Sequence, residues 1–279
     1  MIESCSMSAS INPVARSVRL GVLTLLLAFC TVQDSARADW HPLAGGEPWP
    51  APDAPISHRE RTLESSTGRT VRVHLALFDS RRYRLAVLDL GPELAPASAW
   101  PERTRAAGLS AAVNGGFFHA DGQPLGLVIA EGERFNRFET VKLLSGVLYG
   151  DARGIHLERR ARFQSHPGID ALVQSGPYLV EQGRAVRGLS TNDVSRRTFI
   201  ATDWRRHWIL GATRDGLTLA ELAEALATPG ALAPWPVERA LNLDGGTSTG
   251  FLFDPGAGQE PIQLRSRRPV RNLVGVRAR

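Results

Sequence analysis

The chain has 279 residues, with 33 lysines and arginines against 28 aspartates and glutamates, and its formal net charge is +5 at pH 7. This length suffices for one sizeable hydrophobic core. Arginine, which suits carboxylate and phosphate ligands, supplies nearly all of the positive charge, because Lys142 is the only lysine. The sequence has no basic helix, zinc-finger spacing, P-loop or Gly-x-Ser-x-Gly elbow, so we expect no nucleic-acid binding and neither a P-loop nor a serine-elbow hydrolase.

Residues 1–38 have the pattern of a secretory signal peptide. Arg16 and Arg19 precede the short apolar stretch 20–30, and Ala-Arg-Ala at 36–38 offers a cleavage site. The apolar stretch is short for a transmembrane helix. We therefore expect cleavage, no stable membrane insertion afterwards and a periplasmic or secreted location, with an uncleaved signal anchor as the alternative.

Both cysteines, Cys5 and Cys30, lie in this presequence. The mature chain is then expected to have no disulfide, thiolate zinc site or catalytic cysteine. Residues 39–57 are rich in proline and predict an extended linker or a surface strap. The globular domain is expected over 58–279.

Alternating apolar and polar residues predict strands at 71–77 and 83–87, joined as a hairpin. On the first of these strands, His74 falls on the polar side and is expected to be exposed. Further strands are predicted near 110–114, 125–130, 143–149, 154–158, 170–174, 198–203, 207–212, 238–243, 249–253 and 273–277.

Two helices are predicted among these strands. One spans about 97–107, and the other follows a capping box formed by Thr218 and Glu221 and ends near Ala227. A mostly β chain with a few packed helices indicates an α+β fold. We expect mixed, mostly antiparallel sheets in a single domain.

Asp244 directly follows one predicted strand and is the first candidate for a functional residue. The residues after it are Gly245, Gly246, Thr247 and Ser248. Paired glycines let the backbone approach a ligand closely, and freed N–H groups beside hydroxyls can hold an anion such as phosphate. A carboxylate beside such a loop suggests chemistry on a phosphate- or sugar-containing substrate. A tight Asp-Gly turn without function is the alternative.

The strand that ends at Asn114 has a second signature of this kind. Asn114 is followed by Gly115, Gly116 and Phe117. Asn-Gly is also a strong hairpin signal, but the next predicted strand begins only at Leu125. Two strand-end Gly-Gly sites, one led by an amide and one by a carboxylate, are expected to form two walls of one pocket.

Two further strand boundaries are candidates. Ser175 and Gly176 follow a predicted strand and form either an ordinary β-turn or part of the same site. Arg197 precedes another strand, where an arginine can blunt a sheet edge or clamp an anion. A C-terminal basic cluster is expected to be solvated surface and consists of Arg265, Arg267 and Arg268.

Taken in order, these pieces resemble the phosphodiester glycosidase family over about residues 70–276. The residues that carry the resemblance are Asn114-Gly115-Gly116-Phe117-Phe118, Gly126, Ser175-Gly176-Pro177, Arg197-Thr198, Asp215-Gly216 and Asn242-Leu243-Asp244-Gly245-Gly246 with Ser248. The family tends to have a small residue and then a glycine after Arg197-Thr198, whereas residues 199–202 of this chain include no glycine. The chain also lacks a further glycine after Gly246.

The resemblance implies an α+β fold and hydrolysis of the glycosidic C–O bond of a sugar-1-phosphodiester. Asp244 is then expected to act as nucleophile or general base, Arg197 to neutralise charge on the phosphate, and Asn114 and Ser175 to orient substrate oxygens. The leaving phosphomonoester has a second pKa of about 6 and needs little protonation. One carboxylate could therefore suffice, in contrast to the usual pair. Glu131 and Asp121 are the weaker candidates for a second carboxylate.

Two other functions are open. One is a phosphodiesterase that cuts the P–O bond and uses Asp244 and other carboxylates to hold a divalent metal. The other is a non-catalytic glycan-binding protein of the cell envelope. These residues do not by themselves indicate a cofactor. A bound divalent metal stays an open alternative. The expected partner is a sugar-phosphate or an envelope glycan.

Overall fold

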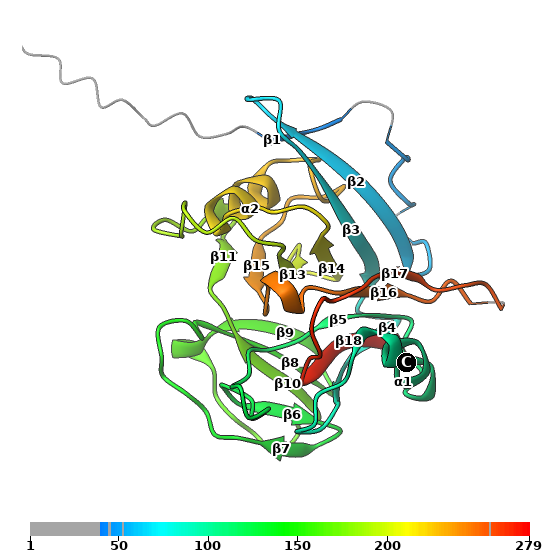
Figure 1. The fold of residues 1–279 in the computed structure, drawn as a ribbon, viewed down its shortest axis with the longest axis vertical. Helices are drawn as coiled ribbons and strands as arrows, with labels where there is room; N and C mark the ends of the chain where they lie inside the picture. The colour runs from blue at the N-terminus through cyan, green and yellow to red at the C-terminus, as the bar shows by residue number, and fades with distance from the viewer. Residues whose placement is uncertain (1–39, 44–45, 52, 257) are drawn as a thin grey trace, which may run out of the picture. The chain divides into compact units, whose positions relative to one another are not determined.

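The computed structural model describes residues 40–43, 46–51, 53–256 and 258–279. The signal peptide predicted at 1–38 and both cysteines lie outside the described residues. Strands dominate the described chain and form three sheets, in which every pairing between named strands is antiparallel. The mostly antiparallel sheets and the small number of helices agree with the predicted fold class, although the β content is higher than the α+β label suggests (Figure 1).

The largest sheet, sheet A, has eight strands. In spatial order they are β1 (Trp40–Pro42), β2 (Ser57–Ser65), β3 (Thr70–Asp79), β14 (His207–Thr213), β13 (Thr198–Thr202), β15 (Arg239–Asn242), β11 (Tyr178–Glu181) and β12 (Arg184–Ala185). β1 lies within the proline-rich segment 39–57, which was expected to be a linker or strap. Trp40 is buried in the core beneath the second helix, and this burial explains why the segment joins the sheet.

Two five-stranded sheets complete the β structure. Sheet B has the order β17 (Ile262–Leu264), β16 (Phe251–Phe253), β5 (Ala111–Asn114), β18 (Asn272–Ala278) and β4 (Tyr83–Asp89). Sheet C has the order β7 (Glu133–Phe135), β6 (Val128–Ala130), β10 (Ala171–Ser175), β8 (Gly146–Asp151) and β9 (Gly154–Arg159).

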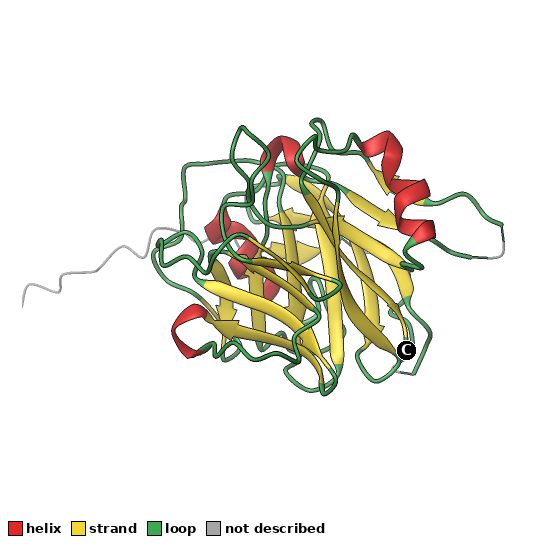
Figure 2. Ribbon diagram, turned by 90° about the horizontal axis from the view of Figure 1, so that it is seen from below, coloured by secondary structure: helices red, strands yellow, loops and turns green. Residues whose placement is uncertain are grey.

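The helices are few and short beside the strands (Figure 2). They are α1 (Trp100–Ala106), α2 (Leu219–Ala227) and the 3-10 turns η1 (Ala97–Ala99), η2 (Arg160–Arg162) and η3 (Gly246–Ser248). The predicted capping box is confirmed, because the Thr218 hydroxyl accepts from the Glu221 N–H while the Glu221 carboxylate accepts from the Thr218 N–H. Among the described helices, none has the length and apolar character needed to cross a bilayer.

The predicted hairpin between 71–77 and 83–87 is wrong. Both segments are strands, but β3 pairs with β2 and β14, whereas β4 pairs with β18 across seven residue positions. Both edges of β3 are therefore occupied by other strands. The turn at 80–82 instead carries the chain from sheet A to sheet B.

Sheet A is covered on both faces, and this corrects the expectation that His74 is exposed. Val73 and Leu75 pack in the core that contains α2, while Ala76 and Phe78 pack in a second core shared by all three sheets. A strand buried on both faces has no polar side. His74 is accordingly only 5% exposed.

The buried His74 pairs with His58 of β2. His74 Nδ1 lies 3.1 Å from His58 Nε2, and both rings pack against Phe251 of sheet B. Glu60 lies 3.5 Å from His74 Nε2. Burial, together with the nearby charges of His74 and Arg59, lowers the pKa of His58 to about 4. Burial also lowers the pKa of His74, against the opposite effect of Glu60.

The His58 pKa predicts acid sensitivity of the fold. Between about pH 6.5 and pH 4 the unfolded His58 binds a proton that the folded one does not, so the free energy of unfolding decreases as pH falls through this window. Urea unfolding measured across this range should show that the free energy of unfolding falls less with decreasing pH in His58→Gln than in the wild type. The glutamine keeps a donor for His74. The matched variant His119→Gln, at an exposed position, should follow the wild type. An equal pH dependence of the free energy of unfolding in the wild type and His58→Gln would contradict the lowered pKa of His58.

Candidate functional site

The two predicted Gly-Gly loops meet, although they follow strands of different sheets. Asp244, after β15 of sheet A, donates its N–H to the Gly115 carbonyl at 2.9 Å. Asn114, at the end of β5 in sheet B, donates from Nδ2 to the Asp244 carbonyl at 2.7 Å. The loop after Asn114 is not a hairpin, because β5 pairs with β16 and β18. The two loops therefore adjoin, and their forming two walls of one pocket stays a prediction.

The Asn114 side chain connects three segments at this junction. Its Oδ1 accepts from the Thr198 hydroxyl at 2.7 Å and from the Gly250 N–H at 3.0 Å, in addition to the Nδ2 bond to Asp244. The residue is 1% exposed. These contacts identify Asn114 as the residue that positions the Asp244 loop.

Gly115 and Gly116 are required by close packing against sheets B and C. A Cβ on Gly115 would lie 2.0 Å from Asn272 Oδ1, and one on Gly116 would lie 2.9 Å from a methyl group of Val173. Their N–H groups donate to the main-chain and side-chain oxygens of Asn272, both at 2.9 Å. These two donors are therefore used within the protein, which differs from the expectation that they are free for an anion. Phe117, the next residue, is half-buried.

The loop after Asp244 has a similar internal bonding pattern. The Gly245 N–H donates to Asp244 Oδ1 at 2.9 Å, and the Gly246 N–H donates to the Arg196 carbonyl at 2.7 Å. Gly246 has a φ of +61°, a left-handed conformation that favours glycine. Thr247 is exposed, whereas Ser248 is buried in the following 3-10 turn.

Asp244 is half-buried, and its surroundings move its ionisation toward neutral pH. Burial raises the pKa of the carboxyl to about 6, while hydrogen bonds with the Ser248 side chain and the Gly245 N–H, and the positive charge of Arg268, act in the opposite direction. A carboxyl with a pKa near 6 exchanges protons close to physiological pH. Perturbed carboxyl groups of this kind are concentrated at functional sites.

The third predicted loop, Ser175–Gly176, adjoins the other two. Asn242 Nδ2 donates to the Gly176 carbonyl at 2.8 Å, which ties the end of sheet C to the strand that precedes Asp244. A Cβ on Gly176 would lie 2.1 Å from the Leu143 carbonyl oxygen, so only glycine fits. Ser175 is fully buried, and neither its hydroxyl nor Asn242 Oδ1 has a partner among the described residues. Unpaired buried polar atoms are uncommon, and those at a site are candidates for ligand contacts.

Arg197 lies beside the same loop but forms no ion pair with Asp244 among the described residues. Its Nε donates to the Leu217 carbonyl at 2.8 Å, and its Nη2 donates to both the carbonyl and the carboxylate of Asp193. Its Nη1 is 3.9 Å from the point where a Cβ on Gly245 would lie. The side chain is thus fixed by its neighbours, 5% exposed, with one nitrogen directed to the Gly245 loop.

Neither weaker carboxylate candidate has a comparable environment. Glu131 is exposed and pairs with Arg277 at 3.5 Å. It lies beyond β6 at the end of sheet C opposite Ser175, because Val128 pairs with Val173 and the Gly132 N–H reaches Asp170. Asp121 is exposed and accepts from the Gln123 N–H in its own turn.

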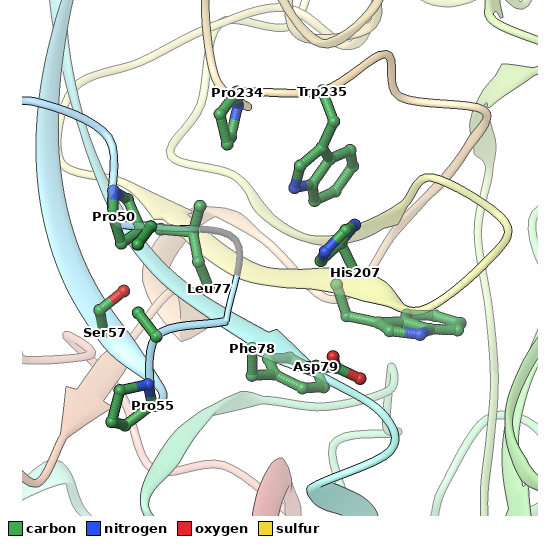
Figure 3. A pocket seen from close by; sticks show the side chains of 12 residues that line it. Pro50, Pro55, Ser57, Leu77, Phe78, Asp79, His207, Pro234 and Trp235 are labelled. Atoms are coloured by element: carbon green, nitrogen blue, oxygen red, sulfur yellow. The ribbon is translucent and has the colours of Figure 1, made fainter.

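A cavity of about 190 Å³ lies elsewhere, at the other end of sheet A. The strand register places Asn242 opposite Phe199 and places Trp208, which lines the cavity, opposite Thr202. Its walls include Trp235 and Pro234 on one side and Pro55 and Ser57 on the other (Figure 3). The Asp79 carboxylate that lines it is bound by Arg81 at 2.7 Å and Arg206 at 3.3 Å. The described lining includes none of the predicted site residues.

The sequence analysis assigned no role to several residues that hold these loops, and it named Asn242 only within the resemblance. These residues are Asn242, Asn272, Asp193 and Arg196. Asn242 ends β15 and Asn272 begins β18, both are buried, and no local sequence pattern marks their contacts. In the described part of the chain, no three His, Cys, Asp or Glu side chains gather as ligands for a metal ion.

Comparison with known proteins identifies the class to which this fold and site belong. The sequence model of the phosphodiester glycosidase family matches residues 107–277. The fold is similar to that of the catalytic domain of zebrafish N-acetylglucosamine-1-phosphodiester alpha-N-acetylglucosaminidase auto-inhibited by its pro-peptide, with a TM-score of 0.61 and 17% identity over 87% of this chain and 89% of that one. A hypothetical protein from Synechocystis gives a TM-score of 0.54 and 19% identity over 81% of this chain and 62% of that one.

A sequence search of curated proteins finds no match. The family match covers more than half of the chain, whereas the structural likenesses, at these identities, show the fold alone. The molecule is a β-rich hydrolase of the glycosidase class. The chain belongs to the phosphodiester glycosidase family.

The bonding of Asn114 predicts that its replacement destabilises the site junction. Asn114→Ala leaves the Gly250 N–H and the Asp244 carbonyl without their partners, so the free energy of unfolding should fall by about 2–4 kcal/mol. The exposed Asn192→Ala should change it by less than about 0.5 kcal/mol. Urea unfolding at neutral pH measures both. An Asn114→Ala effect as small as that of the control would contradict the assigned role.

Proposed function

We propose that the protein hydrolyses the glycosidic C–O bond of a sugar-1-phosphodiester and releases free sugar and a phosphomonoester. The observation that carries the proposal is the environment of Asp244, a carboxyl with a pKa of about 6 where three glycine-containing loops adjoin. Membership of the phosphodiester glycosidase family supports the reaction class. The particular bond and substrate are our inference.

In this proposal Asp244 acts in its ionised form, as a nucleophile at the anomeric carbon or as the general base for water. With a pKa of about 6, the carboxyl is mostly ionised at pH 7. The departing phosphomonoester has a second pKa of about 6 and leaves with little protonation. A second carboxylic acid is then not essential, and this agrees with the exposed positions of Glu131 and Asp121.

The other predicted residues are assigned by their contacts. Arg197, held by Asp193 and the Leu217 carbonyl, is preorganised to neutralise charge on the phosphate through its remaining nitrogen, Nη1. The unpaired hydroxyl of Ser175 is a candidate contact for a substrate oxygen. Asn114 acts through Asp244, because its side-chain oxygen and an amide proton are engaged within the protein.

We further propose that the protein is exported to the periplasm or secreted and acts on envelope glycans with sugar-1-phosphate links. The pattern of 1–38 supports export. Determining the N-terminus of the protein recovered from an envelope fraction tests this, since a start at Asp39 agrees with cleavage and a start within 1–38 does not.

Product identification tests the reaction. The chain from Asp39 onward should release free GlcNAc and a phosphomonoester from a methyl-phospho-GlcNAc diester, or free GlcNAc and UDP from UDP-GlcNAc, when products are identified by mass with and without EDTA. Formation of GlcNAc-1-phosphate that EDTA abolishes would establish a metal phosphodiesterase in place of this proposal. Calorimetric binding without any product, across a panel of sugar phosphodiesters, would establish a glycan-binding protein.

The ionisation of Asp244 predicts the pH dependence and a diagnostic variant. The kcat/KM should rise as pH increases through about 6, because the reactive form is the carboxylate. Asp244→Asn should reduce kcat by about a thousandfold or more. It should unfold at the same or a higher urea concentration at pH 7, since it removes a desolvated charge. Glu131→Gln, at an exposed position, is the matched control and should retain activity. Near-normal turnover in Asp244→Asn would refute the assignment.

A further inference from the structure

Four arginines surround the loop that follows Asp244. Arg196 precedes β13, and the other three, Arg265, Arg267 and Arg268, lie between β17 and β18. The Arg196 carbonyl accepts from the Gly246 N–H at 2.7 Å, and the Arg267 N–H donates to the Thr247 carbonyl at 2.8 Å. Both segments are therefore hydrogen-bonded to the loop after Asp244. The cluster 265–268 is solvated, as expected, but it adjoins the candidate site.

The arginines are held by neutral groups. Arg196 Nη2 donates to the Thr249 carbonyl at 2.8 Å and to the Arg265 carbonyl at 3.3 Å, which joins the two segments. Arg265 Nε donates to the Gln263 side-chain oxygen at 3.1 Å. The Arg268 guanidinium lies 4.9 Å from the centre of the Phe118 ring. These contacts hold the side chains of Arg196, Arg265 and Arg268 without an ion pair.

None of the four forms an ion pair in the described part of the chain, in contrast to Arg197 with Asp193 and Arg271 with Asp89. Burial lowers the pKa of Arg196, and the positive charge of Arg267 lowers it further, so these two cations repel each other. Arg196 Nε is buried and has no partner among the described residues. Asp215 acts on Arg196 and Asp244 on Arg268, but the four cations outnumber these two carboxylates. Like charges in such excess form a site for a bound anion, which reduces the repulsion.

We propose that Arg196, Arg265, Arg267 and Arg268, here termed the basic rim, bind a second phosphate in the part of the substrate beyond the scissile bond. One phosphodiester carries a single negative charge, and the fixed Arg197 is already placed to compensate it. The rim adds four positive charges beside the same loop, three of them on exposed side chains. The substrate class that this charge pattern fits is a chain with successive phosphodiesters, such as the end of a sugar-phosphate or polyol-phosphate polymer.

This inference rests on the proposed function for the position of the scissile bond, but its binding component can be measured without turnover. The probes are methyl glycerophosphate, which has one phosphodiester, and a methyl-capped glycerophosphate dimer, which has two. Neither contains a glycosidic bond. Calorimetry at low ionic strength should show binding of the dimer on the order of tenfold tighter than that of the single diester.

Paired arginine variants test which charges produce this preference. Arg265→Gln with Arg267→Gln should remove the preference for the dimer, because both side chains belong to the rim. Arg105→Gln with Arg184→Gln makes the same change in net charge at exposed positions on α1 and β12 and should retain the preference. Equal affinity for the two probes, or an equal loss of preference in both paired variants, would refute the proposal that the basic rim binds a second phosphate.

The outcomes for binding and turnover are separable. Preference for the dimer without glycosidic cleavage would retain the rim and reject the proposed reaction. Glycosidic cleavage without preference would retain the reaction and reject the rim.

Discussion

The buried side chain of Asn114 is the interaction on which the candidate site depends. It bonds to Thr198 of sheet A, to the Gly250 N–H that leads into β16, and to the carbonyl of Asp244. These segments are far apart in the sequence, and sheets A and B are separate sheets among the described strands. A net hydrogen bond contributes only about 0.5–1.5 kcal/mol, but an orphaned buried partner costs more, so one amide can define the junction. Asp244 is consequently positioned by sheet B even though it follows a strand of sheet A.

Much of the strand content could be predicted from apolar alternation, but pairing partners could not. The residues of β2, with Leu63 as its one aliphatic side chain, do not show alternation, yet the strand forms because β3 offers an unpaired edge and Arg61 reaches the Glu47 carbonyl. The false hairpin after β3 has a related origin. A tight turn is visible in the sequence, whereas the competition for the edges of β3 is a property of the folded sheet. His74 was misplaced because a second face of sheet A is covered by elements that local periodicity does not reveal.

The glycines of the candidate site were recognised from the sequence, but the physical reason for them differs from the expected one. Gly115 and Gly116 are required where the backbone meets Asn272 and Val173, and their N–H groups are already bonded. The partner residue, Asn272, follows much later in the chain and is inconspicuous at the start of an apolar strand. Long-range side-chain to main-chain bonds of this kind have no local sequence pattern. The sequence therefore indicated which loops matter without indicating what holds them together.

Arg197 forms no ion pair with Asp244 among the described residues, and this affects the pKa of the carboxyl and so its reactivity. An arginine paired directly with a carboxylate lowers its pKa and reduces its basicity. Arg197 is bound to Asp193 instead, and burial keeps the pKa of Asp244 at about 6. A phosphate brought next to Asp244 would add negative charge and raise this pKa further, which favours the protonated, unreactive form. Cations near the phosphate oppose that effect without quenching the carboxylate. Arg197 and the basic rim would therefore keep Asp244 ionised at the moment when an anionic substrate is bound.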